Sequence, residues 1–506
     1  MPAQLKHIIS SIWQYNPAEP LFYTGVAFWV AFTLILGIYS LVYKKSPLRN
    51  GYLLVVSWFI YYQLGGAFLL LLIVSCLANY GFGLLIAKPN LKRPWLTIAV
   101  SFNLLILGYF KYTYFLVDNI NWLFDTHWQV FNWIGWALNQ LVKNAADEHS
   151  ILLPIGISFY TFQAISYLVD VYRGDSDVVR NPLDFSFYLS FFPQLVAGPI
   201  VRAASFIPQM YQRFRLKKAE FSHAIFLISK GLFKKMVIAD FLAVNFIDRI
   251  FEAPLAYSGL ENLFSVYAYS LQIYCDFSGY TDIAIGLALI LGFKIPVNFN
   301  APYKATSLTD FWHRWHISLS LWLRDYLYIP LGGNRKGQVR MYVNLLITMI
   351  LGGLWHGANL RFLIWGAVHG FGLALEKLMR QTLGFGHKLS FWQRGLSIFV
   401  TFQVISFAWL FFRAKDQATI RQFFYQVGHH FFPQNLAAGW ESYRYVIGIF
   451  ILGLFVIWIP NRWKEWLRGA FIELHFTVQI LLVLLLVGLI YFVAGAGLQP
   501  FIYFRF

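Results

Sequence analysis

Long uncharged runs of apolar residues recur along nearly the whole chain, separated by short polar stretches. The first extends over residues 20–43, and at about 1.5 Å per residue a helix of that length crosses a hydrocarbon core of roughly 30 Å with some tilt. The second, 51–87, is too long for one crossing and is interrupted near Gly65 and Gly66, which predicts two helices, the first of them short. Further candidate crossings are 94–117, 151–171, 263–293, 341–360, 362–375, 395–412, 445–460 and 474–494.

These runs predict an all-α polytopic membrane protein with roughly a dozen transmembrane helices. Composition agrees, because 58% of the 506 residues are hydrophobic and only 12% are charged, whereas a soluble domain carries about 25% charged residues. A soluble globule is therefore excluded. No pattern indicates nucleic-acid binding, and the excess of basic residues, a net charge of +17, is typical of cytoplasmic loops.

The positive-inside rule assigns the basic clusters to the cytoplasm and the N-terminus to the outside. By the same alternation the tryptophan-rich loop 118–150 faces outward and suits an interfacial segment. The clusters are Lys44, Lys45 and Arg49; Lys88, Lys92 and Arg93; Arg213, Arg215, Lys217 and Lys218; Arg335, Lys336 and Arg340; and Arg462, Lys464 and Arg468.

One apolar stretch breaks this alternation. Residues 185–201 lie between two basic points that are both assigned to the cytoplasm, and Pro193, Gly198 and Pro199 interrupt them. A re-entrant segment fits better than a crossing. Since irregular backbone at membrane depth needs protein or water to satisfy its polar groups, we expect the fold to enclose a polar chamber.

Ionisable residues are concentrated in two stretches, and inside a membrane such residues are a functional hypothesis by default. In 309–337, helical spacing puts His313, His316, Ser320 and Arg324 on one polar face that we expect to line the chamber. A surface helix with solvated charges is the alternative. No carboxylate or cysteine accompanies the two histidines, so no metal site is expected.

In the second stretch, 341–360, His356 is the only ionisable group apart from one tyrosine. Helical spacing aligns it with Gly352 and Asn359, and the small residues before it suggest room for a substrate. A neutral imidazole in apolar surroundings suits a general base. The alternative is a histidine bonded across a helix interface, with glycines that permit close packing.

Other polar residues in apolar runs, such as Asp276, Asp282 and Lys111, are explained by structural ion pairs, and Cys76 and Cys275 by packing. No nucleotide-binding loop or serine-hydrolase elbow is present.

Six segments carry a resemblance to a known family. They include FFPQLVAGPIVR, YCDFSGYTDIAIGLALILGF, FWHRWHISLSLWLRDYLYIPLGGNR, LGGLWHGANLRFLIWGAVHG and the terminal PFIYFRF. The chain resembles the membrane-bound O-acyltransferase family, and within it the bacterial branch typified by the membrane subunit of alginate O-acetylation. The resemblance implies a single integral membrane domain over 1–506, with a catalytic core at about 104–370 and peripheral helices at 20–87 and 395–506.

It also implies a two-histidine site, His356 in the W-H-G motif and His316 in W-H-I-S-L-S, within a tunnel between a cytoplasmic acyl donor and an external acceptor. We expect His356 to act as general base, and His316 with Asn359 to orient the donor or stabilise the oxyanion. Supporting roles are expected for Ser320, Arg324, His313, Asp276 and Asp282. Arg335 and Lys336 are candidates for holding the anionic donor.

The expected reaction moves an acetyl group from a cytoplasmic thioester, acetyl-CoA, to a hydroxyl. That hydroxyl belongs to an exopolysaccharide such as alginate or to a periplasmic partner acetyltransferase. No bound cofactor is expected, and the location is the bacterial inner membrane, in contact with its lipid. The alternatives are transfer of D-alanine or another acyl group to a cell-wall polymer, and a secondary transporter or flippase.

Overall fold

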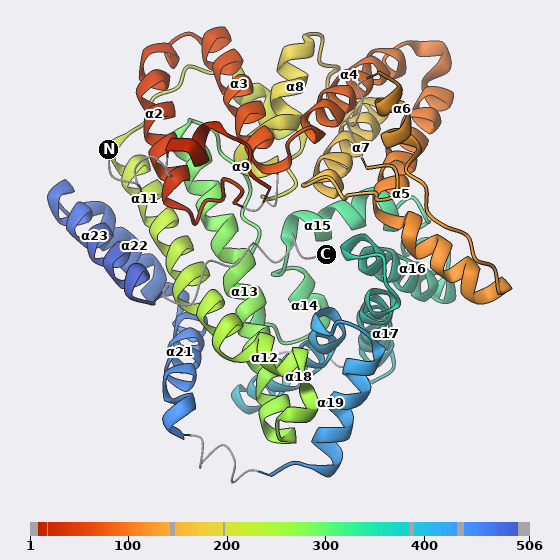
Figure 1. Ribbon diagram of the computed structural model, residues 1–506, viewed down its shortest axis with the longest axis vertical. Helices are drawn as coiled ribbons and strands as arrows, with labels where there is room; N and C mark the ends of the chain where they lie inside the picture. The colour runs from red at the N-terminus through yellow and green to blue at the C-terminus, as the bar shows by residue number, and fades with distance from the viewer. Residues whose placement is uncertain are drawn as a thin grey trace.

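The computed structural model describes residues 9–17, 19–141, 147–195, 198–383, 389–432 and 440–493, and all regular elements among them are helices (Figure 1). The predicted all-α class is confirmed. The helices are α2 (Val26–Val42), α3 (Ser46–Gly65), α4 (Phe68–Ile86), α5 (Lys92–Phe124), α6 (Trp133–Leu141), α7 (Ile157–Arg173), α8 (Pro182–Ser190), α9 (Phe192–Leu195), α10 (Ala203–Met210), α11 (Lys218–Leu232), α12 (Asp248–Glu252), α13 (Gly259–Ile290), α14 (Leu308–Trp312), α15 (Ile317–Leu323), α16 (Gln338–His356), α17 (Leu360–Leu383), α18 (Phe391–Arg413), α19 (Gln417–His429), α21 (Trp440–Trp458), α22 (Asn461–Glu473) and α23 (Phe476–Val493). Three π-helical stretches are η2 (Phe233–Asp240), η3 (Ala243–Ile247) and η6 (Arg324–Tyr328).

Seven helices within the described residues are long and apolar enough to cross a membrane, namely α4, α5, α13, α17, α18, α21 and α23. The chain is thus a multi-pass membrane protein, but a count of roughly a dozen crossings is not confirmed. Some predicted runs form helices that are too short; the run 20–43, for example, becomes the 17-residue α2 because its first residues lie outside the helix.

Helix α13 forms the centre of the molecule. In the most apolar 18-residue stretch of α13, 89% is buried inside the protein, whereas the corresponding share in α23 is 11%. α13 is therefore a core element, and α23 presents its side chains outward. A capping box fixes where α13 begins: Ser258 Oγ accepts the Glu261 N–H at 3.3 Å, and Glu261 Oε2 accepts the Ser258 N–H at 2.8 Å. In Figure 1 it runs beside α11 through the middle of the fold.

The run 51–87 divides into two helices, as predicted, and the break lies at Gly66. This residue has φ of 56°, a left-handed conformation that glycine adopts without steric cost. The first helix is not short, however. α3 begins at Ser46, inside the polar stretch, and comprises 20 residues.

Residues 185–201 fold as the predicted irregular segment. They form α8 and the four-residue α9, no regular element is assigned to the described residues 198–201, and the described side chains of this segment are buried. Trp58 of α3 donates to Ser190 Oγ at 3.2 Å, and Ser57 Oγ accepts the Phe192 N–H at 3.2 Å. The protein thus surrounds this broken backbone, which is the condition that non-helical backbone at membrane depth requires.

Helix α5 is longer than the predicted crossing and ends at Phe124; the next residue, Asp125, has φ of 50°. Its last turns project from the body at the right of Figure 1. Trp122 and Trp128 near this end are exposed, as an interfacial segment requires.

Candidate active site

His356 is the last residue of α16 and is buried in aromatic rings. Its ring centroid lies 5.0 Å from that of Trp355, 5.1 Å from that of Trp365 and 5.1 Å from that of Phe412. The helix ends here because the backbone becomes extended at Gly357, where a Cβ would lie 2.0 Å from the Phe362 ring. The glycine of the W-H-G motif therefore lets Phe362 close over the turn that carries the histidine.

The glycines that precede His356 do not make room for a substrate. A Cβ on Gly353 would lie 2.2 Å from the carbonyl oxygen of Phe362, and one on Gly352 would lie 3.2 Å from Leu323. Their role is close packing of α16 against α17 and α15, which was the alternative interpretation of this pattern.

His316 is fully buried and has φ of 43°, a left-handed conformation that is unusual for a residue with a side chain. Its ring contacts those of Phe277 at 4.8 Å, Trp355 at 6.2 Å and Phe159 at 6.5 Å. Trp355 therefore borders both histidines, and the two predicted catalytic residues share one buried site. A non-glycine residue held in this conformation costs free energy, and such residues cluster at functional sites.

The predicted polar face over 309–337 is wrong, because the helix is interrupted. α14 ends at Trp312, the backbone reverses at His316, and α15 begins at Ile317. Helical spacing does not continue across a left-handed residue. Of the four residues on the predicted face only His316 is fully buried; His313 and Arg324 are exposed, and Ser320, whose hydroxyl donates to the Trp315 carbonyl at 3.2 Å, is half-buried.

Helix α5 supplies two side chains that hold the end of α16. Lys111 Nζ donates to the carbonyl oxygen of Trp355 and lies 3.3 Å from Ser158 Oγ, and Tyr112 Oη donates to the Leu354 carbonyl at 2.9 Å. The last carbonyls of a helix lack partners within it, so these donors stabilise the turn on which His356 sits.

A third histidine lies beside the first two. His369 of α17 is fully buried, and its ring lies 4.7 Å from Trp365, which also contacts His356. Neither ring nitrogen of His369 has a hydrogen-bond partner within the described residues. His369 is therefore a further buried imidazole on the Trp365 side of His356.

Asp276 and Asp282 take part in buried ion pairs. Asp282 pairs with Lys230 at 3.0 Å and with Lys234, and Asp276 pairs with Lys235 at 2.9 Å. The lysines belong to α11 and η2, which pack along α13. This is the structural explanation that the sequence suggested for such residues.

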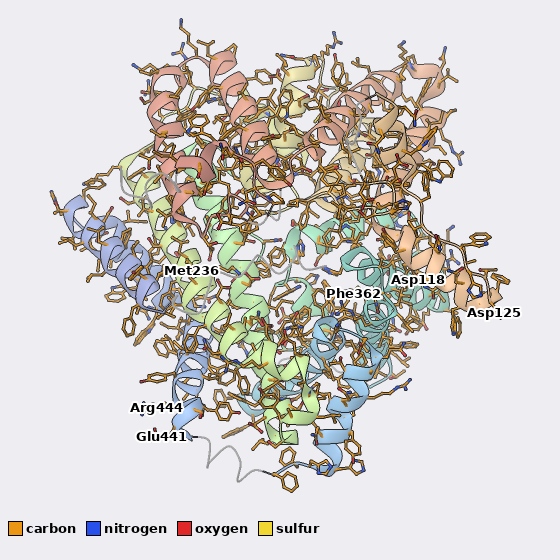
Figure 2. The ribbon with its side chains drawn as sticks, in the orientation of Figure 1. Asp118, Asp125, Met236, Phe362, Glu441 and Arg444 are labelled. Atoms are coloured by element: carbon orange, nitrogen blue, oxygen red, sulfur yellow. The ribbon has the colours of Figure 1, made fainter. Side chains whose placement is uncertain are left out.

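A cleft of about 970 Å³ lies next to His356. One wall is a face of α5, and the other is the turn after His356 together with the start of α19; Asp118 and Phe362 belong to opposite walls (Figure 2). Asn359 lines the cleft as well, and its Oδ1 accepts the Arg361 N–H at 3.1 Å. We call this the outer cleft, because residues of the stretch 118–150, which the sequence predicts to face outward, line it. Its α5 face consists of Phe110, Lys111, Tyr114, Phe115, Asp118, Asn119 and Trp122.

Asp416 marks the rim of the outer cleft and caps α19. Its Oδ1 accepts the N–H and the hydroxyl of Thr419, both at 2.8 Å, and these bonds lower the pKa of Asp416 below its ordinary value. The rim thus carries a carboxylate that stays ionised at neutral pH.

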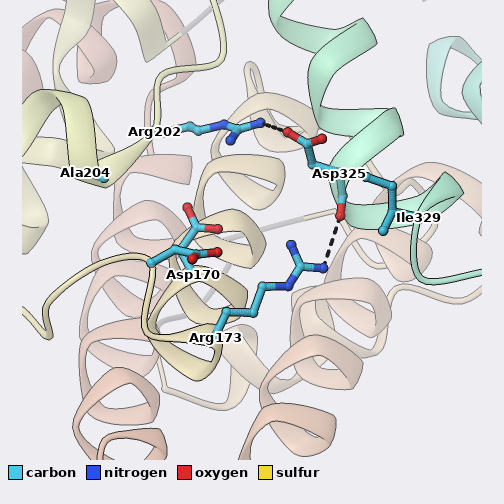
Figure 3. Close-up of a pocket in the computed structure, with 7 residues that line it drawn as sticks. Asp170, Arg173, Arg202, Ala204, Asp325 and Ile329 are labelled. Carbon is cyan, nitrogen blue, oxygen red and sulfur yellow. Dashed lines mark hydrogen bonds and ion pairs between the residues drawn. The ribbon is translucent and has the colours of Figure 1, made fainter.

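A second pocket, of about 230 Å³, lies at the end of η6 (Figure 3). Arg202 forms an ion pair with the carboxylate of Asp325, and Arg173 donates to the Asp325 carbonyl at 3.1 Å. Asp170, which accepts the Tyr326 hydroxyl at 2.6 Å, lies beside them. We call this the arginine pocket. It lies on the side that the positive-inside rule assigns to the cytoplasm.

Helix α7, which contacts α15 at Trp322, connects the arginine pocket with His316. Along α7, Phe159 contacts His316, Phe162 stacks on Trp322 at 3.7 Å, and Arg173 reaches the pocket. From Phe159 to Arg173 the helical rise is about 20 Å. The histidines therefore lie between two pockets, the arginine pocket beyond α15 and the outer cleft beyond α16, and line neither of them.

Comparison with known proteins identifies the family. The family model described as the membrane-bound O-acyltransferase family matches residues 105–415, more than half of the chain. This chain belongs to the membrane-bound O-acyltransferase family. It is an O-acyltransferase, and the resemblance drawn from the motifs is confirmed.

Curated relatives of this membrane-bound O-acyltransferase cover most of its length. The protein named "Probable alginate O-acetylase AlgI" of Pseudomonas syringae pv. tomato is 40% identical over 78% of this chain and 73% of its own. The peptidoglycan O-acetyltransferase of Helicobacter pylori is 37% identical over 74% of this chain and 73% of its own. The teichoic acid D-alanyltransferase of Bacillus subtilis is 28% identical over 53% of this chain and 70% of its own.

Three residues of this acyltransferase site were not predicted from the sequence as site residues. Lys111 was noted as a charge within an apolar run, and that anomaly was the available signal. His369 stands among apolar residues of α17, and no helical spacing of polar residues distinguishes it. Asn298, which contacts His316, lies in an irregular segment where no helical spacing applies.

Proposed function

We propose that this O-acyltransferase moves an acetyl group from acetyl-CoA on the cytoplasmic side of the bacterial inner membrane to a hydroxyl of a cell-surface polysaccharide on the outer side. The observation that carries the proposal is the burial of His316 and His356 at one site between two openings. The names of the relatives that share about 40% of their aligned residues with this chain support acetyl as the acyl group.

In the proposed reaction, His356 takes the proton of the acceptor hydroxyl as its oxygen attacks the thioester carbon. The new C–O bond forms, the C–S bond breaks, and the departing thiolate receives the proton from His356, so that free CoA leaves as a thiol. Burial in aromatic rings excludes water, which would otherwise hydrolyse the thioester. His316 faces the same site and acts on the donor.

The two openings support separate entry of the substrates. The distance along α7 from the arginine pocket to His316, about 20 Å, is one that an extended pantetheine arm covers. On the other side, the outer cleft combines aromatic side chains with polar ones such as Asp118 and Asn119, a lining that suits a sugar with its apolar faces and its hydroxyls. The acceptor hydroxyl would approach His356 from there, either on the polysaccharide itself or on a partner acetyltransferase.

The proposal is tested by release of free thiol from acetyl-CoA by purified protein in lipid, with oligosaccharide acceptors. The variant His356→Ala should reach the membrane as a folded protein, yet transfer acetyl about 10²-fold more slowly or worse, because general-base catalysis contributes that much. His313→Ala is the matched control. It removes an exposed imidazole three residues before His316 and should leave the rate unchanged.

Retention of acetyl transfer by His356→Ala would overturn the assignment of the base. Thiol release that occurs with a D-alanyl thioester but not with acetyl-CoA would instead favour the reaction named for the Bacillus subtilis relative.

A further inference from the structure

The side chain of Asn298 contacts the N-terminus of α15 at three atoms. Its Oδ1 accepts the Ser318 N–H at 3.1 Å and the Ser318 hydroxyl at 2.9 Å, and it lies 3.3 Å from Nδ1 of His316. The Asn298 carbonyl also accepts the Ile317 N–H at 3.0 Å. Asn298 is 1% exposed, so these are enclosed hydrogen bonds rather than surface contacts.

These contacts fix the orientation of the Asn298 amide. A backbone N–H can only donate, so the atom that faces the Ser318 N–H must be the amide oxygen and not the amide nitrogen. The same oxygen lies against Nδ1 of His316. Because an oxygen of this kind only accepts, the hydrogen bond requires a proton on Nδ1.

The tautomer of His316 follows from that proton. A neutral imidazole carries one N–H, so a proton on Nδ1 leaves a lone pair on Nε2. Nε2 is buried and has no hydrogen-bond partner within the described residues. The His316 ring is surrounded by the rings of Phe159, Phe277 and Trp355, and these surroundings favour the neutral imidazole, since a buried charge without a counter-ion is costly.

We infer that Asn298 is a positioning residue that fixes His316 as a hydrogen-bond acceptor, with the Nε2 lone pair directed into the buried site. The inference rests on the proposed function for its chemical meaning. A neutral His316 with this tautomer has no N–H to offer an oxyanion. Of the two roles considered for His316, orienting the donor therefore remains, and oxyanion stabilisation is excluded.

The group that His316 would accept from is an N–H of the donor. α15 begins directly after His316 and continues through η6 to the arginine pocket, whereas Gly357, the residue after His356, lines the outer cleft; His316 therefore stands on the donor side of the site. The pantetheine arm of an acyl-CoA contains amide N–H groups close to its sulfur. An Nε2 lone pair that accepts a hydrogen bond from one of these amides would hold the thioester at a fixed position relative to His356.

The tautomer can be measured without turnover. In protein labelled with ¹⁵N-histidine and held in lipid nanodiscs, a long-range ¹H–¹⁵N correlation distinguishes Nδ1–H from Nε2–H, and the signal that disappears in His316→Gln belongs to His316. We expect the Nδ1–H form. Finding the proton on Nε2 would overturn the inference, even if the enzyme used another donor or acceptor than we propose.

Three variants test the role of Asn298. Asn298→Leu removes the acceptor oxygen and should lower kcat/KM for acetyl-CoA at least tenfold, with the KM for the acceptor unchanged and the Nδ1–H signal lost. Asn298→Asp keeps an acceptor oxygen there, and as the neutral acid that burial favours it should retain the Nδ1–H signal and more of the activity than Asn298→Leu. Ser318→Ala removes one bond to the same oxygen and serves as the structural control, with activity within about threefold of wild type.

An equal loss in Asn298→Asp and Asn298→Leu, or a wild-type rate in Asn298→Leu, would contradict the positioning role. If Ser318→Ala lowers the rate as far as Asn298→Leu, the effect belongs to the fold of this segment, and the inference fails.

Discussion

Lys111 lies beside the turn that carries His356, and it holds that turn by hydrogen bonding to the Trp355 carbonyl. Its ammonium also lies 5.7 Å from the centre of the Trp355 ring, the ring that both histidines contact. One side chain thus links α5, the outer cleft and the catalytic site, and we expect it to act on the rate by positioning rather than by chemistry.

Lys111→Met keeps the apolar stem and removes the charged donor. A hydrogen bond from a charged group contributes about 1.5–3 kcal/mol, so kcat should fall tenfold or more if the loss is felt in the transition state. Tyr112→Phe removes a neutral hydrogen bond to the neighbouring Leu354 carbonyl and should cost less, about 1 kcal/mol. Steady-state rates of the two variants test this order, and a wild-type rate in Lys111→Met would refute the positioning role.

At the residue scale, the sequence predicts a buried site residue where a single ionisable side chain stands in an apolar run. His356 could be singled out because it is the lone imidazole of an uncharged run, and it is buried at the site. The polar face with His313 and Arg324 failed, because a single left-handed residue at His316 breaks the helical phase on which the prediction depended. Asn298 escaped prediction because its partners come from the fold and not from its neighbours.

At the scale of elements, α16 and α17 pack so closely that their backbones touch at glycines. A Cβ at Gly353 would meet the Phe362 carbonyl at 2.2 Å, and one at Gly366 would meet the Met349 carbonyl at 2.3 Å. The sequence predicted both helices, although α17 continues to Leu383, well beyond the predicted run 362–375, and it did not reveal that their glycines serve packing. The predicted count of roughly a dozen crossings is not confirmed, because an apolar run also forms a helix that is too short or broken.

Gly353→Ala should separate α16 from α17 and lower thermal stability in detergent by about 1–3 kcal/mol, the usual cost of overpacking. Gly448→Ala in α21 is the matched control, since a Cβ there meets nothing within 4 Å, and it should leave stability unchanged or slightly raised. Equal melting temperatures for the two variants would mean that the contact between α16 and α17 is not as close as described.

At the scale of the whole molecule, the helices place two buried histidines between openings that the distribution of basic residues assigns to opposite sides of the membrane. Neither opening could be predicted from the sequence, because each is formed by segments far apart in the chain. The arginine pocket joins α7 to η6, and the outer cleft joins α5 to the turns before α17 and α19. The expectation of a chamber rested only on the broken segment 185–201.

The central claim is that an acyl group passes from one side of the membrane to the other through this site. The direct measurement uses proteoliposomes with acetyl-CoA enclosed and an oligosaccharide acceptor outside. Orientation is established by labelling Asn119→Cys with an impermeant maleimide, since Cys76 and Cys275 are buried. Vesicles whose outer cleft faces outward should acetylate the external acceptor and release thiol inside, and His356→Ala vesicles should do neither. Acetylation that requires donor and acceptor on the same side would contradict the account.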